Sequence, residues 1–103
     1  MPRPDKVRHI FSIPEVKQFR PQGVKTVSLD KVELTLDEFE AIRLADYEGL
    51  EHSEAAVLMN ISRPTFSRVL DRGRRKIALF LVEAKPLDIN GGNVVVKSKS
   101  DDK

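Results

Sequence analysis

The sequence predicts an all-α fold, with a helix-turn-helix core, an irregular N-terminal arm and at most a short C-terminal β-hairpin. Three observations predict this fold class. Apolar residues recur at steps of three and four over residues 36–45 and again over residues 66–84, as in helices with one buried face. Residues 60–62 suit a tight turn between two helices. Prolines are concentrated in residues 1–25, where little regular structure is expected. The length of 103 residues fits one domain.

The N-terminal segment, residues 1–33, is basic and contains prolines, and it is expected to pack on the core or to extend from it as an arm. Arg3 and Arg8 are among its basic residues, and arms of this kind can follow the backbone of a nucleic acid. The alternative is a frayed terminus. A secretory signal is not expected, because the apolar stretch is short and no small-residue cleavage site follows it.

The helix-turn-helix domain is predicted over residues 34–85, and its first helix over about Leu36 to Tyr47. Thr35 followed by Glu38 has the spacing of a capping box. Acidic residues near the start of a helix also suit its dipole, so a catalytic carboxylate pair is not expected here. The acidic residues of this region are Asp37, Glu38, Glu40, Asp46 and Glu48.

The turn of the motif follows a second helix, expected from about Ser53 to Met59. Asn60 can adopt the left-handed conformation that a tight turn needs. Ser62 can cap the third helix, and Pro64 fits in the first turn, where no intrahelical hydrogen bond is lost.

The third helix is predicted to continue to about Ala84, with one apolar stripe facing the core. Phe66 lies on this stripe, so we interpret it as a core residue and not as a platform for stacking bases. Gly73 also lies on it and lowers helix propensity, which predicts close packing of another helix. Arginine-rich positions are left facing outward.

The C-terminal part, residues 86–96, is predicted to be extended. Two short strands, Leu87–Ile89 and Val94–Val96, flank the turn-forming residues 90–92 and would form a hairpin. An isolated hairpin is only marginally stable, so this one should pack on the helices or pair with another chain. Residues 97–103 are polar and are expected to be disordered.

The charge of the chain is segregated, although the net charge is only +2. Lys and Arg dominate residues 1–25 and 62–76, whereas Asp and Glu dominate residues 30–54. Such a distribution predicts basic segments that bind phosphates while the acidic helix faces away. The alternative is that each charged run is a solvated helix face.

Several other functions are not expected from the composition. The chain has no cysteine, and His9 and His52 have no clear companions, so neither a metal site nor another cofactor is predicted. Nothing resembles a nucleophile with its base or a phosphate-binding loop, and we therefore predict no enzymatic activity. No apolar run is long enough to span a membrane, and a cytoplasmic location is compatible with the composition.

Three strings carry a resemblance to a known family. They are LTLDEFEAIRLADYEGL at 34–50, EAAVLMNISRPTFSRVL at 54–70 and RRKIALFLVEAKPLDINGG at 74–92. The chain resembles a small, mainly uncharacterised family of prokaryotic predicted DNA-binding proteins, whose helix-turn-helix is similar to region four of sigma factors. The resemblance implies a helical core and transcription-related DNA binding without enzymatic activity.

The chain departs from this family at a few positions. Members often have a cysteine near Ile10 or Phe11, and this chain has none. Glu51 stands where a serine usually caps the second helix, so Ser53 is expected to take over as the cap. Asn60 stands where the turn usually has glycine.

The main hypothesis from the sequence is a sequence-specific double-stranded DNA-binding protein that regulates transcription, with the helix after Ser62 in the major groove. A homodimer is expected, formed through Phe80, Leu81 and Val94–Val96. The alternative is a protein-interaction module of the transcription machinery, whose acidic helix would bind a basic partner such as an RNA polymerase component. The predicted base contacts are Ser62, Arg63, Thr65, Ser67 and Arg68, and the predicted phosphate contacts are Arg72, Arg75, Lys76, Arg3 and Arg8.

Overall fold

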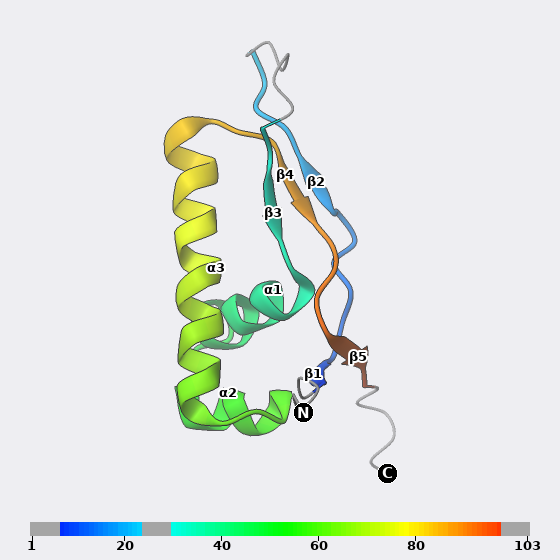
Figure 1. Ribbon diagram of the computed structural model, residues 1–103, viewed down its shortest axis with the longest axis vertical. Helices are drawn as coiled ribbons and strands as arrows, with labels where there is room; N and C mark the ends of the chain where they lie inside the picture. The colour runs from blue at the N-terminus through cyan, green and yellow to red at the C-terminus, as the bar shows by residue number, and fades with distance from the viewer. Residues whose placement is uncertain (1–6, 24–29, 98–103) are drawn as a thin grey trace, which may run out of the picture.

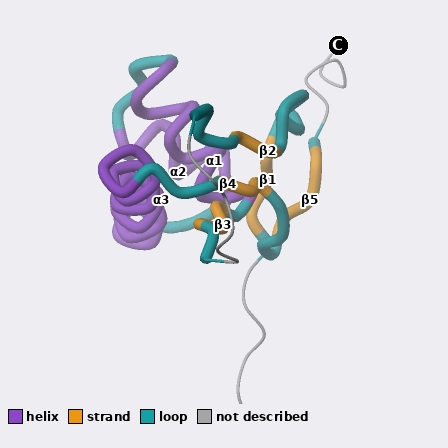
Figure 2. The backbone as a smooth tube through the Cα atoms, turned by 90° about the horizontal axis from the view of Figure 1, so that it is seen from above, coloured by secondary structure: helices purple, strands orange, loops and turns teal. Residues whose placement is uncertain are grey.

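The computed structural model of the chain describes residues 7–23 and 30–97, which form a helical part and a strand part lying side by side (Figures 1 and 2). About 48% of the described residues are helical and 16% lie in strands, so the fold is mixed α/β and the all-α prediction is wrong. The strands at Leu87–Ile89 and Val94–Val96 are those expected from the sequence, whereas the other three have only two or three residues and lie in segments where no alternating apolar pattern reveals them.

The helices follow the predicted order. Helix α1 spans Leu36–Ile42 and continues as a π-helical turn, η1, over Arg43–Tyr47. Helix α2 spans His52–Met59, and helix α3 spans Arg63–Glu83. In Figure 1, α3 runs along one side of the molecule and α2 lies across its N-terminal end. No helix in the described ranges has both the length and the apolar character needed to cross a membrane.

Local capping defines the helix ends largely as predicted. The capping box of Thr35 and Glu38 is present at α1. Ser62 caps α3, because its side-chain oxygen accepts a hydrogen bond from the Thr65 backbone N–H at 3.2 Å. The cap of α2 was predicted wrongly, since the helix begins one residue before Ser53 and Glu51 is its N-cap. Glu51 can serve because its carboxylate suits the positive end of the helix dipole.

The turn between α2 and α3 is tight. Asn60 has the predicted left-handed conformation, with φ 62° and ψ 41°. Ile61 is buried beneath the turn and joins the core formed by the three helices. Phe66 of α3 is fully buried in this core, which confirms its interpretation as a core residue. The helix pair is therefore held rigidly from its inner side.

Close packing between α1 and α3 explains the glycine in the middle of α3. A Cβ atom at Gly73 would lie 3.0 Å from Cδ1 of Ile42 and 3.3 Å from Cβ of Glu38. Ordinary carbon contacts are longer than this, so a side chain at position 73 would require Ile42 or α1 to shift by a few tenths of an ångström. The predicted approach of another helix at Gly73 is confirmed.

Three short strands form a sheet in the order β2-β4-β3. Strand β4 (Leu87–Ile89) lies in the centre, parallel to β3 (Val32–Leu34) and antiparallel to β2 (Gln18–Phe19). Strand β1 (Arg8–Ile10) pairs in parallel with β5 (Val94–Val96) in a second sheet. Because β1 and β2 come from the N-terminal segment and Ile10 is buried, the described part of that segment packs on the core, which was one of the two expectations, and the irregular arm of the predicted fold class is wrong there.

The predicted hairpin between residues 87–89 and 94–96 is also wrong, because β4 and β5 pair with other strands. The connecting residues bond to the start of α1 and not across a hairpin. The backbone N–H of Asn90 donates to the carbonyl of Leu34 at 3.0 Å, and the N–H of Leu36 donates to the carbonyl of Gly91 at 2.9 Å. These bonds direct the chain away from β4 and towards β1.

Helix α3 packs its C-terminal half against one face of the three-stranded sheet. The apolar residues of β3 and β4 are buried there with Ile77 and Phe80. The ring of Phe80 also meets that of Phe19 edge-on, with centroids 6.4 Å apart. Phe80 is therefore partly buried within its own chain, which leaves less of its side chain for the dimer surface predicted from the sequence.

Candidate nucleic-acid interface

The N-terminal end of α3 is the exposed end of a well-anchored helix. Val69 and Leu70 are buried on its inner side, whereas Ser62, Arg63 and Arg68 are exposed. In the described ranges, neither Arg63 nor Arg68 takes part in an ion pair. Both guanidinium groups can therefore bind an external acceptor without first breaking an internal salt bridge.

Two of the predicted base contacts, Thr65 and Ser67, form side-chain hydrogen bonds within the chain. The Ser62 hydroxyl donates to Oγ1 of Thr65 at 2.9 Å, so the Thr65 side chain belongs to the helix cap. Oγ of Ser67 lies 3.1 Å from Nδ1 of His52 in α2. Both Thr65 and Ser67 are half-buried. Sequence periodicity places both side chains outward. It cannot show the bond of Ser67, because His52 lies in another helix.

Two of the predicted phosphate contacts share a buried carboxylate. Nζ of Lys76 lies 2.8 Å from Oε1 of Glu38, and Nε of Arg72 lies 3.5 Å from its Oε2. Burial by itself raises the pKa of Glu38, but hydrogen bonds from Lys76 and the Thr35 backbone N–H outweigh it and hold the pKa below its ordinary value. Glu38 is therefore an anion at neutral pH that positions both cations.

Arg74 and Arg75 of α3 differ in whether they form an ion pair within the described chain. Arg74 makes a two-point contact with Asp46, with its Nη2 2.6 Å from Oδ1 and its Nε 3.0 Å from Oδ2. The hydrogen bond from Arg74 holds the pKa of Asp46 below its ordinary value. Arg75 is exposed and forms no ion pair with any described residue. Arg74 is thus neutralised within the chain, whereas Arg75 is not.

The predicted arginines of the N-terminal segment do not reach this surface as an arm. Arg8 lies in β1, its side chain is 16% exposed, and its Nε is 3.5 Å from Oδ2 of Asp37 in α1. Arg3 lies outside the described residues, as does most of the tail at 97–103 that is predicted to be disordered. The described part of the segment therefore supplies an internal ion pair.

The acidic helix does not face away from the basic one, and that prediction is wrong. Asp37, Glu38 and Glu40 are buried. Glu40 accepts hydrogen bonds from Nη2 of Arg43 at 2.9 Å and from the Phe11 backbone N–H at 3.1 Å. These acids are bound by cations and N–H groups of their own chain, because an unpaired buried charge would be strongly destabilising.

No group of three or more His, Asp or Glu side chains in the described part of the chain is arranged to hold a metal ion. The two histidines have other surroundings. His52 bonds Ser67 and meets the ring of Phe66 at a centroid distance of 5.4 Å, and His9 lies in β1. At the exposed N-terminal end of α3 the charged groups are the guanidinium groups of Arg63 and Arg68, which suit phosphates and guanine edges.

Comparisons with known proteins give a family but no activity. A family model described as "Protein of unknown function DUF134" matches residues 1–97. A "UPF0251 protein" of Chloroherpeton thalassium is 51% identical over 98 residues, which cover 95% of this chain and 65% of that protein. Another, of Thermoanaerobacter pseudethanolicus, is 50% identical over 93 residues, covering 90% of this chain and 79% of the relative.

A third relative, from Halothermothrix orenii, is 47% identical over 93 residues and is also called a "UPF0251 protein". This chain covers 69% of it, so it spans about two thirds of the length of the Chloroherpeton and Halothermothrix proteins. No solved structure matches the chain.

Proposed function

The chain belongs to the family described as protein of unknown function DUF134, and we propose that it is a sequence-specific double-stranded DNA-binding protein that regulates transcription. The N-terminal end of α3 inserts into the major groove, as the second helix of a helix-turn-helix does. The resemblance to region four of sigma factors supports a role at promoters, and hence in the cytoplasm.

One observation carries the proposal. Arg63 and Arg68 are exposed cations that form no ion pair with any residue in ranges 7–23 and 30–97, and they stand on a helix end that the Asn60 turn and the Ser62 cap hold in place. Arginine can donate two hydrogen bonds to the O6 and N7 atoms of guanine, which is the commonest specific contact in the major groove. We assign the reading of bases to these two residues, with Ser62, Thr65 and Ser67 beside them.

Phosphate contacts come from the flank of the same helix. The Arg72 side chain is 54% exposed and that of Lys76 is 33% exposed, so each keeps donors available to solvent. Glu38 holds both in place before DNA arrives, which reduces the entropy lost when they bind phosphate. Such contacts position the protein on the duplex but do not read its sequence.

In the part of the chain that the structure describes, no feature favours the alternative of an acidic interaction surface for an RNA polymerase component. Three of the five acidic residues of the first helical region are buried, and only Asp46 and Glu48 are exposed. Asp46 is already bound by Arg74, and Glu48 by Arg43 at 3.1 Å. A basic partner would therefore have to displace ion pairs of the chain itself.

Selection of bound duplexes from a random DNA pool tests the proposal. We expect the wild-type chain to enrich one sequence, and binding to weaken steeply as salt rises because counterions are released. Arg68→Ala should lose the sequence preference by about 1–3 kcal/mol at the contacted base. Arg20→Ala, an exposed arginine beyond β2, is the matched control and should enrich the same sequence.

A wild-type chain that enriches no sequence and shifts DNA only at low salt would show that the DNA-binding proposal is wrong. Circular dichroism of each variant should remain that of the wild type, so that a loss of preference cannot come from unfolding.

A further inference from the structure

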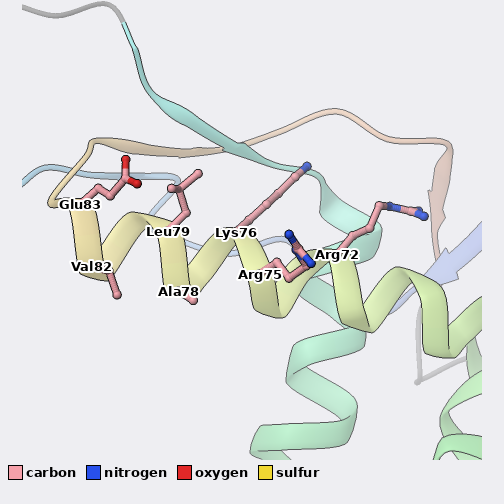
Figure 3. A pocket seen from close by; sticks show the side chains of 7 residues that line it. All are labelled: Arg72, Arg75, Lys76, Ala78, Leu79, Val82 and Glu83. Atoms are coloured by element: carbon pink, nitrogen blue, oxygen red, sulfur yellow. The ribbon is translucent and has the colours of Figure 1, made fainter.

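The C-terminal half of α3 carries a shallow groove of about 620 Å³ along its exposed flank (Figure 3). Cations lie at one end of it, apolar side chains in the middle and a carboxylate at the other end. Val82 is 82% exposed and Leu79 is 40% exposed. The lining residues are Arg72, Arg75, Lys76, Ala78, Leu79, Val82 and Glu83.

The spacing of the groove residues along α3 suits the binding of another helix. Arg75, Leu79 and Val82 follow one another at steps of four and three, so they lie on one side of α3. Leaving such a side chain in water costs roughly 1.5–3 kcal/mol relative to burying it. Nothing else in the described part of the chain covers Val82.

The charges decide what kind of partner fits. DNA does not fit, because Glu83 would repel phosphates and the apolar middle would find no partner on a duplex. Arg75 and Glu83 stand at equal distances, four residues, on either side of Leu79. If a second α3 packs antiparallel with Leu79 against Leu79, the Arg75 of each copy therefore faces the Glu83 of the other.

We propose that this face joins two copies of the chain, with their α3 helices antiparallel around a two-fold axis near Leu79. The contact is isologous, since each copy contributes the same residues and both charge pairs form at once. The sequence predicts that Arg75 binds phosphate, but in this arrangement it binds Glu83 of the second copy. The Glu83 side chain is 53% exposed, and its contact within the chain, to Nζ of Lys85, is long at 3.6 Å.

This pairing differs from the one expected from the sequence, because Phe80 packs on the sheet instead. It also goes beyond the proposed function and does not depend on it. A pair of helices contacting over about three turns buries less than the roughly 1,200 Å² typical of stable complexes, so the dimer should be weak.

Sedimentation equilibrium without DNA tests the proposal, from micromolar to millimolar protein. We expect the wild-type chain to dimerise in this range, and Glu83→Arg or Arg75→Glu alone to weaken the dimer about tenfold or more, since each places like charges opposite one another twice. The double variant Arg75→Glu/Glu83→Arg should restore dimerisation. An equal mixture of the two single variants should form the heterodimer, in which all facing charges are opposite.

Arg20→Glu is the control, because it changes the charge of the chain as Arg75→Glu does but lies outside the groove. It should leave the dimer unchanged. A wild-type chain that stays monomeric at millimolar concentration would overturn the proposal, and so would a dimer that the single charge reversals do not weaken. A double variant that fails to regain dimerisation while folded would overturn the antiparallel arrangement.

The two proposals can fail separately. A chain that enriches no DNA sequence but shows the pattern of charge reversals would leave the helix pairing intact. Glu83→Arg should still bind a selected DNA half-site as a monomer, because Glu83 lies about five turns from the N-terminal end of α3.

Discussion

Glu38 shows at the scale of a single residue how the opposite charges of α1 and α3 are brought together. It completes the cap of α1 by accepting from the Thr35 backbone N–H at 3.0 Å and also binds Lys76 and Arg72 of α3. The sequence predicts the cap, because both partners are three residues apart. It does not predict the ion pairs, because Lys76 is 38 residues away and only the packing of the two helices brings it close.

Replacing Glu38 with glutamine should lower the free energy of unfolding at pH 7 by about 2 kcal/mol, as expected for hydrogen bonds to a charged group. The pKa of Glu38 is lowered in the folded state, so its contribution is present above the unfolded pKa of about 4.3 and is lost as pH falls through the folded value. Urea unfolding at pH 7 and pH 3 measures the difference between Glu38→Gln and the wild type. A difference that is equally large at both pH values would show that the carboxylate charge is not the source.

Gly73 tests the packing of the same two helices. Alanine gains about 1 kcal/mol of helix propensity, but its Cβ would press on Ile42 and on the backbone of α1, and overpacking typically costs about 1–3 kcal/mol. We expect Gly73→Ala to destabilise the chain slightly and Gly73→Leu to destabilise it much more. Thermal unfolding gives the order, and a stabilised Gly73→Leu would contradict the close contact.

At the scale of elements, the helices were predictable and the sheets were not. Periodicity and caps are local, so α1, α2 and α3 could be found from neighbouring residues. Strand pairing here depends on segments far apart, because β1 pairs with β5 and β4 lies between β2 and β3. The turn signal at residues 90–92 is real, but its backbone bonds go to the start of α1. A local reading therefore gives a hairpin where the chain has two parallel pairings.

Engineered cysteines can test the strand pairing, because the natural chain has none. His9 and Val95 are directly opposite in the parallel pair of β1 and β5. Opposite Cα atoms in a sheet lie within the range that a disulfide can bridge. We expect His9→Cys/Val95→Cys to form a disulfide within one chain on mild oxidation, detected by mass spectrometry.

The control is Ile89→Cys/Val94→Cys, which joins the two segments predicted from sequence to form a hairpin. It should stay reduced or cross-link only between chains. Oxidation of the control in place of the first pair would contradict the arrangement of the strands.

At the scale of the whole molecule, many of the segregated charges of the sequence form ion pairs with one another in the folded chain. Acidic residues of α1 and η1 bind Arg8, Arg43, Arg72, Arg74 and Lys76. The basic surface left for partners is therefore smaller than the basic face that the sequence predicts. That surface divides along α3 into an N-terminal end proposed to read DNA and a C-terminal groove proposed to bind a second copy.

The most direct test of the DNA-binding proposal is a map of the surface that meets the duplex. Backbone amide shifts of the 11.7 kDa chain can be followed by NMR while a duplex obtained from the random pool is added. We expect the largest changes at residues 60–68 and smaller ones towards Arg72 and Lys76, with the strands β2, β3 and β4 little affected. Changes centred on those strands, or none at the start of α3 when the duplex is saturating, would contradict it.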